Sequence, residues 1–346
     1  MGADLAPGRP DGAGQDSPLL SVRNLMVRFA VQGGLLLRKI AEIRAVDDVS
    51  FDVAAGETLG LVGESGCGKT TVGRAIVNIL SAMSPGVGVE GRVVYNGDPR
   101  GPVDLLGLGR RAMRTYRSQV QMVFQDPYSS LNPRMTVGET IDEPLRIHTR
   151  DDARTRRARV ISLLERVGLA ADHVTRYPHE FSGGQRQRIG IARALATNPS
   201  VVIADEPVSA LDVSIQAQVV NLLQDLQEEL GLSYIFIAHD LSVVRHVSNR
   251  IAVMYLGSLV EIGPADAVYL EPLHPYSRAL LSAVPQPDPD GTRPDRVRLG
   301  GEVPSPRDKP SGCGFRTRCP IARPSCADAP PPFVQHGDRF VACPWV

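Results

Sequence analysis

The sequence lacks any apolar run that approaches the ~20 residues of a membrane-spanning helix. Its formal net charge is +0, so we expect neither bulk electrostatic binding to anionic lipid nor a nucleic-acid partner. Residues 1–18 lack the apolar core of a secretion signal and are rich in Gly, Pro, Ala and Asp, which predicts a disordered leader on a cytoplasmic protein. The chain has five cysteines, and structural disulfides are not expected in that reducing compartment.

An apolar run at residues 59–62 is followed by the glycine-rich sequence GESGCGKT at residues 63–70 and by a helical pattern at residues 71–77. This is the layout of a P-loop, in which glycines let backbone N–H groups approach phosphate oxygens at a helix N-terminus. We expect Lys69 to contact the β- and γ-phosphates, and the Thr70 hydroxyl to coordinate Mg²⁺. Further nucleotide contacts are predicted at Gly63, Ser65, Gly66, Cys67, Gly68 and Thr71.

A second glycine-rich helix start lies at residues 182–185, where Ser182 is well placed as an N-cap. Gly183 and Gly184 leave backbone N–H groups bare at the start of the helix, and Gln185 follows them. We therefore expect these residues to form a second phosphate-binding end. Because the two ends are far apart in the sequence, they predict two surfaces that close on one triphosphate.

Polar residues also follow three apolar strands. Residues 201–204 are apolar and lead into Asp205 and Glu206, which predicts a buried strand of a parallel sheet with carboxylates at its ligand-binding edge. We expect Asp205 to hold Mg²⁺ through water and Glu206 to act as the general base on the attacking water. Gln125 is placed to reach Mg²⁺ or that water, and His239 to contact the γ-phosphate.

The surrounding pattern predicts an α/β fold. Strands are expected at residues 20–29 and 45–53, a hairpin at residues 250–263, and a helical insertion at about residues 128–180. Phe29, at the end of the first strand, is a candidate to stack on an adenine, and plain sheet packing is the alternative.

Taken in order, these motifs resemble the Walker A motif, Q-loop, signature motif, Walker B motif, D-loop (residues 209–212) and H-loop of ABC-type ATPases. The resemblance covers about residues 20–263, and Phe181 stands where the family usually has Leu. It implies a P-loop ABC nucleotide-binding domain at residues 19–264, with a RecA-like core, an antiparallel β subdomain and the helical insertion. It also implies that two subunits dimerise with ATP bound between them, and that Asp212 is among the residues that contact the nucleotide. Closure of this dimer is then expected to be transmitted to a membrane permease.

The C-terminal residues resemble one subfamily of these ATPases in particular. Residues 274–285 and the cysteine-containing residues 312–344 are similar to the extension of oligopeptide and dipeptide importer ATPases, which implies an extension at residues 265–346 with a linker at 285–310. The expected partners are a second, related ATPase in a heterodimer, two permease subunits and an extracytoplasmic substrate-binding protein, at the cytoplasmic face of the cell membrane. The alternatives are a nickel importer of the same subfamily, a soluble ABC ATPase that is not part of a transporter, and a degenerate regulatory subunit.

Four of the cysteines lie in the last stretch, with the spacing C-x5-C-x6-C-x16-C. Four thiolates in a reducing compartment suit Zn²⁺ or a [4Fe–4S] cluster. The wide spacing and the two Cys-Pro pairs favour the cluster, while zinc and unligated packing cysteines remain alternatives. The predicted ligands are Cys313, Cys319, Cys326 and Cys343.

Overall fold

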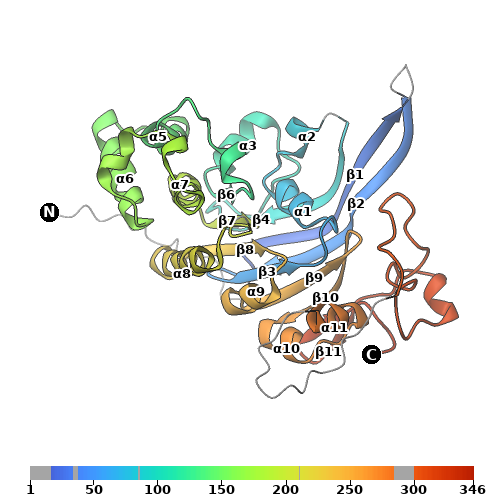
Figure 1. The fold of residues 1–346 in the computed structure, drawn as a ribbon. Helices are drawn as coiled ribbons and strands as arrows, with labels where there is room; N and C mark the ends of the chain where they lie inside the picture. The colour runs from blue at the N-terminus through green and yellow to red at the C-terminus, as the bar shows by residue number, and fades with distance from the viewer. Residues whose placement is uncertain (1–16, 34–37, 85, 210, 284–299) are drawn as a thin grey trace, which may run out of the picture. The chain divides into compact units, whose positions relative to one another are not determined.

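The computed structural model describes residues 17–33, 38–84, 86–209, 211–283 and 300–346 (Figure 1). Residues 1–16 of the predicted leader (1–18) and residues 285–299 of the predicted linker (285–310) lie outside the described residues. The chain divides into two compact units. The first contains the described residues up to Ser21 together with Asp52–Glu57 and Val94–Ile235, and the second contains Val22–Phe51, Thr58–Val93 and Phe236–Val346.

The first unit contains a parallel strand pair. β6 (Val120–Val123) and β7 (Val201–Asp205) run side by side, with Val120 opposite Val201 and Val123 opposite Ala204. Every residue of β7 is buried, as the apolar sequence predicts for a strand covered on both faces. A short strand, β5 (Val103–Asp104), pairs with the end of β4 (Gly88–Tyr95).

The helices predicted between residues 128 and 180 are present in this unit. Their starts follow from local capping: the Thr136 hydroxyl accepts a hydrogen bond from Glu139 N, and the Glu139 carboxylate accepts one from Thr136 N, which closes the start of α5. The helices of this unit are α3 (Arg110–Tyr116), α4 (Pro127–Ser130), α5 (Val137–His148), α6 (Ala153–Arg166), η1 (Ala171–Thr175), η2 (Pro178–Glu180), α7 (Gly183–Leu195) and α8 (Val213–Leu230).

The second unit contains two groups of strands. In one, β2 (Arg38–Val53), β1 (Leu20–Gly33) and β4 lie in that order. In the other, the order is β11 (Val334–His336), β12 (Arg339–Val341), β10 (Ser258–Pro264), β9 (Arg250–Tyr255) and β3 (Thr58–Val62). β3 is parallel to β9, and β9 and β10 form the predicted hairpin. β11 and β12 lie in the cysteine-containing tail and had not been predicted.

The remaining strand, β8 (Ser233–Ile237), begins in the first unit and ends in the second. The helices of the second unit are α1 (Lys69–Ile76), α2 (Leu80–Met83), α9 (Leu241–Val247), α10 (Ala265–Leu270), α11 (Pro275–Ser282) and η3 (Pro324–Ala327). α9 packs against β3 at Gly60, where a Cβ would lie 2.3 Å from Val244 Cγ1. Within the described ranges, no helix is both long enough and apolar enough to cross a membrane.

Candidate active site

The glycine-rich turn between β3 and α1 has a backbone that only glycine tolerates at several positions. The φ angles are +151° at Gly63, +79° at Gly66 and +108° at Gly68. A Cβ at Gly63 would lie 2.2 Å from the carbonyl oxygen of Met254, and one at Gly68 would lie 2.3 Å from that of Ala45. The turn therefore needs glycine for two reasons, its left-handed backbone and its close approach to neighbouring strands.

The N-terminus of α1 faces this turn. Gly68 is the N-cap residue, and no side chain among the described residues caps the helix there. Lys69 is only 5% exposed, and its Nζ donates hydrogen bonds to the carbonyl oxygens of Gly63 at 2.7 Å and Glu64 at 3.1 Å. The ammonium group is thus held inside the turn, next to backbone N–H groups that carry the partial positive charge of a helix start.

Cys67 lies inside the same turn and is buried. Burial raises the pKa of the Cys67 thiol, and the nearby Lys69 charge does not reverse this shift. The residue therefore packs as a neutral thiol. The neighbouring Ser65 and Gly66 are exposed at the tip of the turn.

The second glycine-rich helix end starts α7 in the first unit. Ser182 is its N-cap, as predicted: the hydroxyl accepts from Gln185 N at 3.3 Å, and Gln185 Oε1 accepts from Ser182 N at 3.0 Å. A Cβ at Gly184 would lie 2.5 Å from Ile215 Cγ2 of α8, so this glycine is needed for packing. At Gly183 the nearest atom to such a Cβ would be 3.6 Å away, an ordinary contact. Packing therefore does not explain the glycine at position 183.

The ends of β6 and β7 bring two predicted residues together. Gln125 Nε2 donates a hydrogen bond to Glu206 Oε2 at 2.8 Å. Glu206 has a φ of +45°, a left-handed backbone that is unfavourable for a residue with a side chain and that occurs often at functional sites. Asp205, directly before it, is fully buried at the end of β7. The strand end thus presents one buried carboxylate and one carboxylate positioned by an amide.

Two further predicted residues lie in the second unit. His239 is exposed two residues after the end of β8, and Phe29 is half-buried on β1. The carboxylate of Asp240 accepts from Ser242 N at 2.9 Å and Val243 N at 3.4 Å, so its main role is to cap α9. In the first unit, Asp212 is the N-cap residue of α8.

Comparison with known proteins identifies the family. A family model described as "ABC transporter" matches residues 46–209, and one described as "Oligopeptide/dipeptide transporter, C-terminal region" matches residues 260–326. The chain is 49% identical over 334 residues to the oligopeptide transport ATP-binding protein AppF of Bacillus subtilis, a match that covers 96% of this chain and 98% of the relative. The chain belongs to the family of ABC transporter ATP-binding proteins.

A second relative and a solved structure agree with this assignment. The chain is 54% identical over 333 residues to OppF of Salmonella typhimurium, described as an oligopeptide transport ATP-binding protein, covering 95% of this chain and 96% of the relative. The solved structure is the ATP-binding cassette MJ0796, described as a dimer in a post-hydrolysis state bound to ADP and Pi. It has a TM-score of 0.59 and 28% identity, and the match covers 71% of this chain and 98% of that one. The predicted P-loop ABC fold is confirmed, and this ABC protein is an ATPase.

The C-terminal part of this ABC ATPase contributes two residues that sequence analysis had not assigned to the site. The Tyr276 hydroxyl, on α11, accepts a hydrogen bond from the backbone N–H of Glu64 in the Walker A turn at 2.9 Å. Arg318 forms a fork with the Glu64 carboxylate, with NH1 to Oε2 at 3.0 Å and NH2 to Oε1 at 3.3 Å. No pattern in the sequence indicates this contact, because Glu64 and Arg318 lie 254 residues apart.

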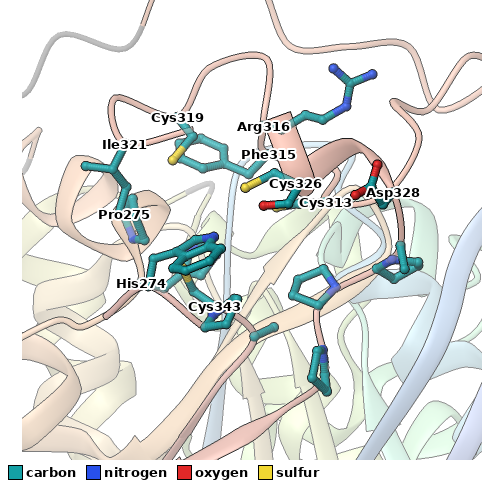
Figure 2. A pocket seen from close by; sticks show the side chains of 18 residues that line it. His274, Pro275, Cys313, Phe315, Arg316, Cys319, Ile321, Cys326, Asp328 and Cys343 are labelled. Carbon is teal, nitrogen blue, oxygen red and sulfur yellow. The ribbon is translucent and has the colours of Figure 1, made fainter. Parts of the chain in front are cut away.

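The four C-terminal cysteines of the ABC ATPase line one pocket of about 220 Å³, together with His274, Phe315 and Trp345 (Figure 2). However, the described residues contain no group of three or more His, Cys, Asp or Glu side chains arranged to hold a metal ion. Burial raises the pKa of the thiols of Cys313, Cys319 and Cys343, which favours their neutral form. The expectation of zinc or a cluster is therefore not supported, because sequence spacing alone does not fix where the sulfur atoms lie.

Proposed function

We propose that this ABC ATPase powers the import of dipeptides or oligopeptides. The proposal is carried by the 49–54% identity to relatives named as oligopeptide transport ATP-binding proteins, which extends through the C-terminal region. Nickel import by a related complex remains the second candidate, since the substrate is selected by other subunits. The proposed complex contains a second, related ATPase, two permease subunits and an extracytoplasmic binding protein, and this chain lies at the cytoplasmic face of the membrane.

In the proposed mechanism, ATP lies between the Walker A turn of one ATPase subunit and the signature motif of the other. The uncapped start of α1 and the glycine at position 183, which packing does not require, support this arrangement, because N–H groups at a helix start bind phosphate oxygens. Nucleotide contacts from both subunits exist only in the closed dimer, so ATP binding favours closure. Hydrolysis then removes those contacts and reopens the dimer.

For the chemical step, we assign the role of general base to Glu206. The 2.8 Å hydrogen bond from Gln125 holds its carboxylate in place at the end of β7, where it can accept a proton from an attacking water. Thr70, Gln125 and Asp205 offer hydroxyl, amide and carboxylate oxygens, which is the donor chemistry that Mg²⁺ prefers. When bound, Mg²⁺ neutralises charge on the phosphates. His239 is assigned to the γ-phosphate and Phe29 to the adenine.

For the four C-terminal cysteines we retain the hypothesis of a [4Fe–4S] cluster held by Cys313, Cys319, Cys326 and Cys343. All four line one pocket, but no three of them are arranged to hold a metal ion within the described residues, so binding would require their side chains to move. Iron and zinc analysis of the full chain purified without oxygen tests this assignment. Iron that is present in the parent chain and lost in the double variant Cys319→Ser/Cys343→Ser supports it, whereas zinc or an unchanged iron content contradicts it.

The mechanism is tested by Glu206→Gln, which keeps the size of the side chain and an oxygen that can accept a hydrogen bond but removes the basic carboxylate. We expect ATP turnover to fall by more than about 100-fold while ATP affinity is retained, since general-base catalysis contributes factors of this size. Glu228→Gln, on the exposed side of α8, is the matched control and should turn over ATP like the parent chain. Turnover by Glu206→Gln within tenfold of the parent would exclude Glu206 as the base.

The transport role is tested in cells of the source organism that lack the chromosomal copy of this chain. Uptake of labelled tripeptide and of nickel is measured after the parent chain or Glu206→Gln is restored. Peptide uptake that returns with the parent chain alone supports peptide import. Return of nickel uptake alone favours the second candidate, and return of neither contradicts both.

A further inference from the structure

The strongest unassigned feature of the second unit is a buried connection between the four-cysteine segment and the Walker A turn. Arg318 lies directly before Cys319, yet its guanidinium reaches Glu64 and its side chain is only 9% exposed. The carboxylate of Glu64 is 27% exposed and receives both guanidinium nitrogens, a forked geometry that fixes orientation as well as charge. An ion pair held in this way is oriented far more strongly than a pair on an open surface.

An aromatic cluster holds Arg318 in this position. The rings of Tyr255, Tyr276 and Phe315 meet with centroid distances of 4.7, 5.2 and 5.4 Å, and all three side chains are buried. Arg318 NH1 also approaches the Tyr255 hydroxyl at 3.5 Å, and its backbone N–H donates to Phe315 O at 3.0 Å. The arginine is therefore attached to a rigid cluster rather than to a freely moving loop.

The same cluster is fixed to β10 through α11. Buried Glu261 accepts hydrogen bonds from the backbone N–H groups of Leu273 at 2.9 Å and His274 at 3.0 Å. His274 Nδ1 accepts from Tyr276 N at 3.1 Å and caps α11. Burial lowers the pKa of His274 to about 3, so the imidazole is neutral and its Nδ1 is free to act as an acceptor. Tyr276 then presents its hydroxyl to the backbone of the Walker A turn.

The negative charge of Glu64 relates this connection to ATP binding. Glu64 is the second residue of a turn that binds a polyanion, so its carboxylate opposes phosphate binding unless it is neutralised and held aside. We propose that Arg318 is a positioning residue for ATP: it neutralises Glu64 and fixes the Walker A turn in its phosphate-binding form, which makes the four-cysteine segment part of the ATP site. This inference rests on the proposed phosphate site at the Walker A turn.

The experiment is a double-mutant cycle on the full chain, with the dissociation constant for Mg-ATP as the measurement. Arg318→Met should raise this constant about tenfold and raise KM in parallel, while kcat at saturating ATP changes less than twofold. In the Glu64→Gln background no carboxylate needs neutralising, so Arg318→Met should alter the dissociation constant less than twofold. Arg318→Lys keeps the charge without the fork and should give an intermediate value.

Arg316→Met is the matched control, because Arg316 lies in the same segment and donates instead to Ser311 O at 2.9 Å and Ser311 Oγ at 3.3 Å. It should bind ATP like the parent chain. If Arg318→Met does not fold, as judged by its thermal unfolding, Arg318→Lys replaces it in the cycle. An unchanged dissociation constant, or an equal change in both Glu64 backgrounds, would overturn the proposal.

Lys69→Ala separates this inference from the phosphate site on which it rests. Loss of ATP binding in Lys69→Ala together with normal binding in Arg318→Met would remove the Arg318 proposal alone. ATP binding by Lys69→Ala at the parent affinity would instead show that the Walker A assignment itself is wrong.

Discussion

The two glycine-rich helix ends have similar sequences, but their backbones are built in different ways. At the Walker A turn, Gly68 has a φ of +108° and precedes a helix that no described side chain caps. At the signature motif, Ser182 and Gln185 form a capping box, and Gly183 has room for a Cβ. The first end thus needs glycine for its backbone and its packing, whereas the second end has a side-chain cap and does not need Gly183 for packing. We propose that Gly183 instead keeps the backbone accessible to phosphate.

The largest expected effect on folding is at the Walker A turn. Gly68→Ala should destabilise the chain by about 3 kcal/mol and abolish ATP binding, because the new Cβ meets the Ala45 carbonyl in a strained left-handed backbone. Gly66→Ala is the control: its φ is also positive, but no described atom lies within 4 Å of the added Cβ, so we expect a cost of only about 1 kcal/mol. Denaturant unfolding measures both, and equal costs would contradict the role of the close approach.

At the signature motif, a glycine-to-alanine change should reduce ATP turnover without destabilising the chain. Gly183→Ala places a methyl group in ordinary contact at a helical position, so stability should stay the same or rise by up to about 1 kcal/mol. ATP turnover should nevertheless fall about tenfold, because the methyl group obstructs the backbone that we assign to phosphate. Gly190→Ala, inside the same helix, is the control and should keep full turnover. A Gly183→Ala chain with normal turnover would remove the functional explanation for this glycine.

The smallest expected effect concerns the capping box at the start of α7. Ser182→Ala removes the hydroxyl that accepts from Gln185 N and should cost about 1 kcal/mol of unfolding free energy. Thr136→Ala removes the corresponding cap of α5 and should cost about as much. Thermal unfolding compares the two, and steady-state assays should show a raised KM for ATP in Ser182→Ala alone. Equal kinetics in both variants would mean that Ser182 is only a cap.

The motifs could be predicted because their geometry depends on neighbours in the sequence. The Ser182 cap and the β9–β10 hairpin follow from residues within a few positions of one another, and the apolar residues of β7 show that the strand is buried. Asp240 shows the limit of such local signals. It follows a strand, as the predicted ligand residues do, but its carboxylate caps α9. Local capping and ligand binding use the same residue types, so a short sequence does not distinguish them.

The sequence by itself determined the ABC fold, the order of the ATPase motifs and the two glycine-rich helix starts. Only the tertiary structure decided that Glu64 pairs with Arg318, 254 residues further along the chain, and that Tyr276 reaches the Walker A backbone. It also showed that cysteines spaced for a metal site line one pocket without forming a ligand set in the described chain. The physical reason is that backbone conformation and capping are set by nearby residues, whereas partners distant in sequence meet only after the intervening chain has packed.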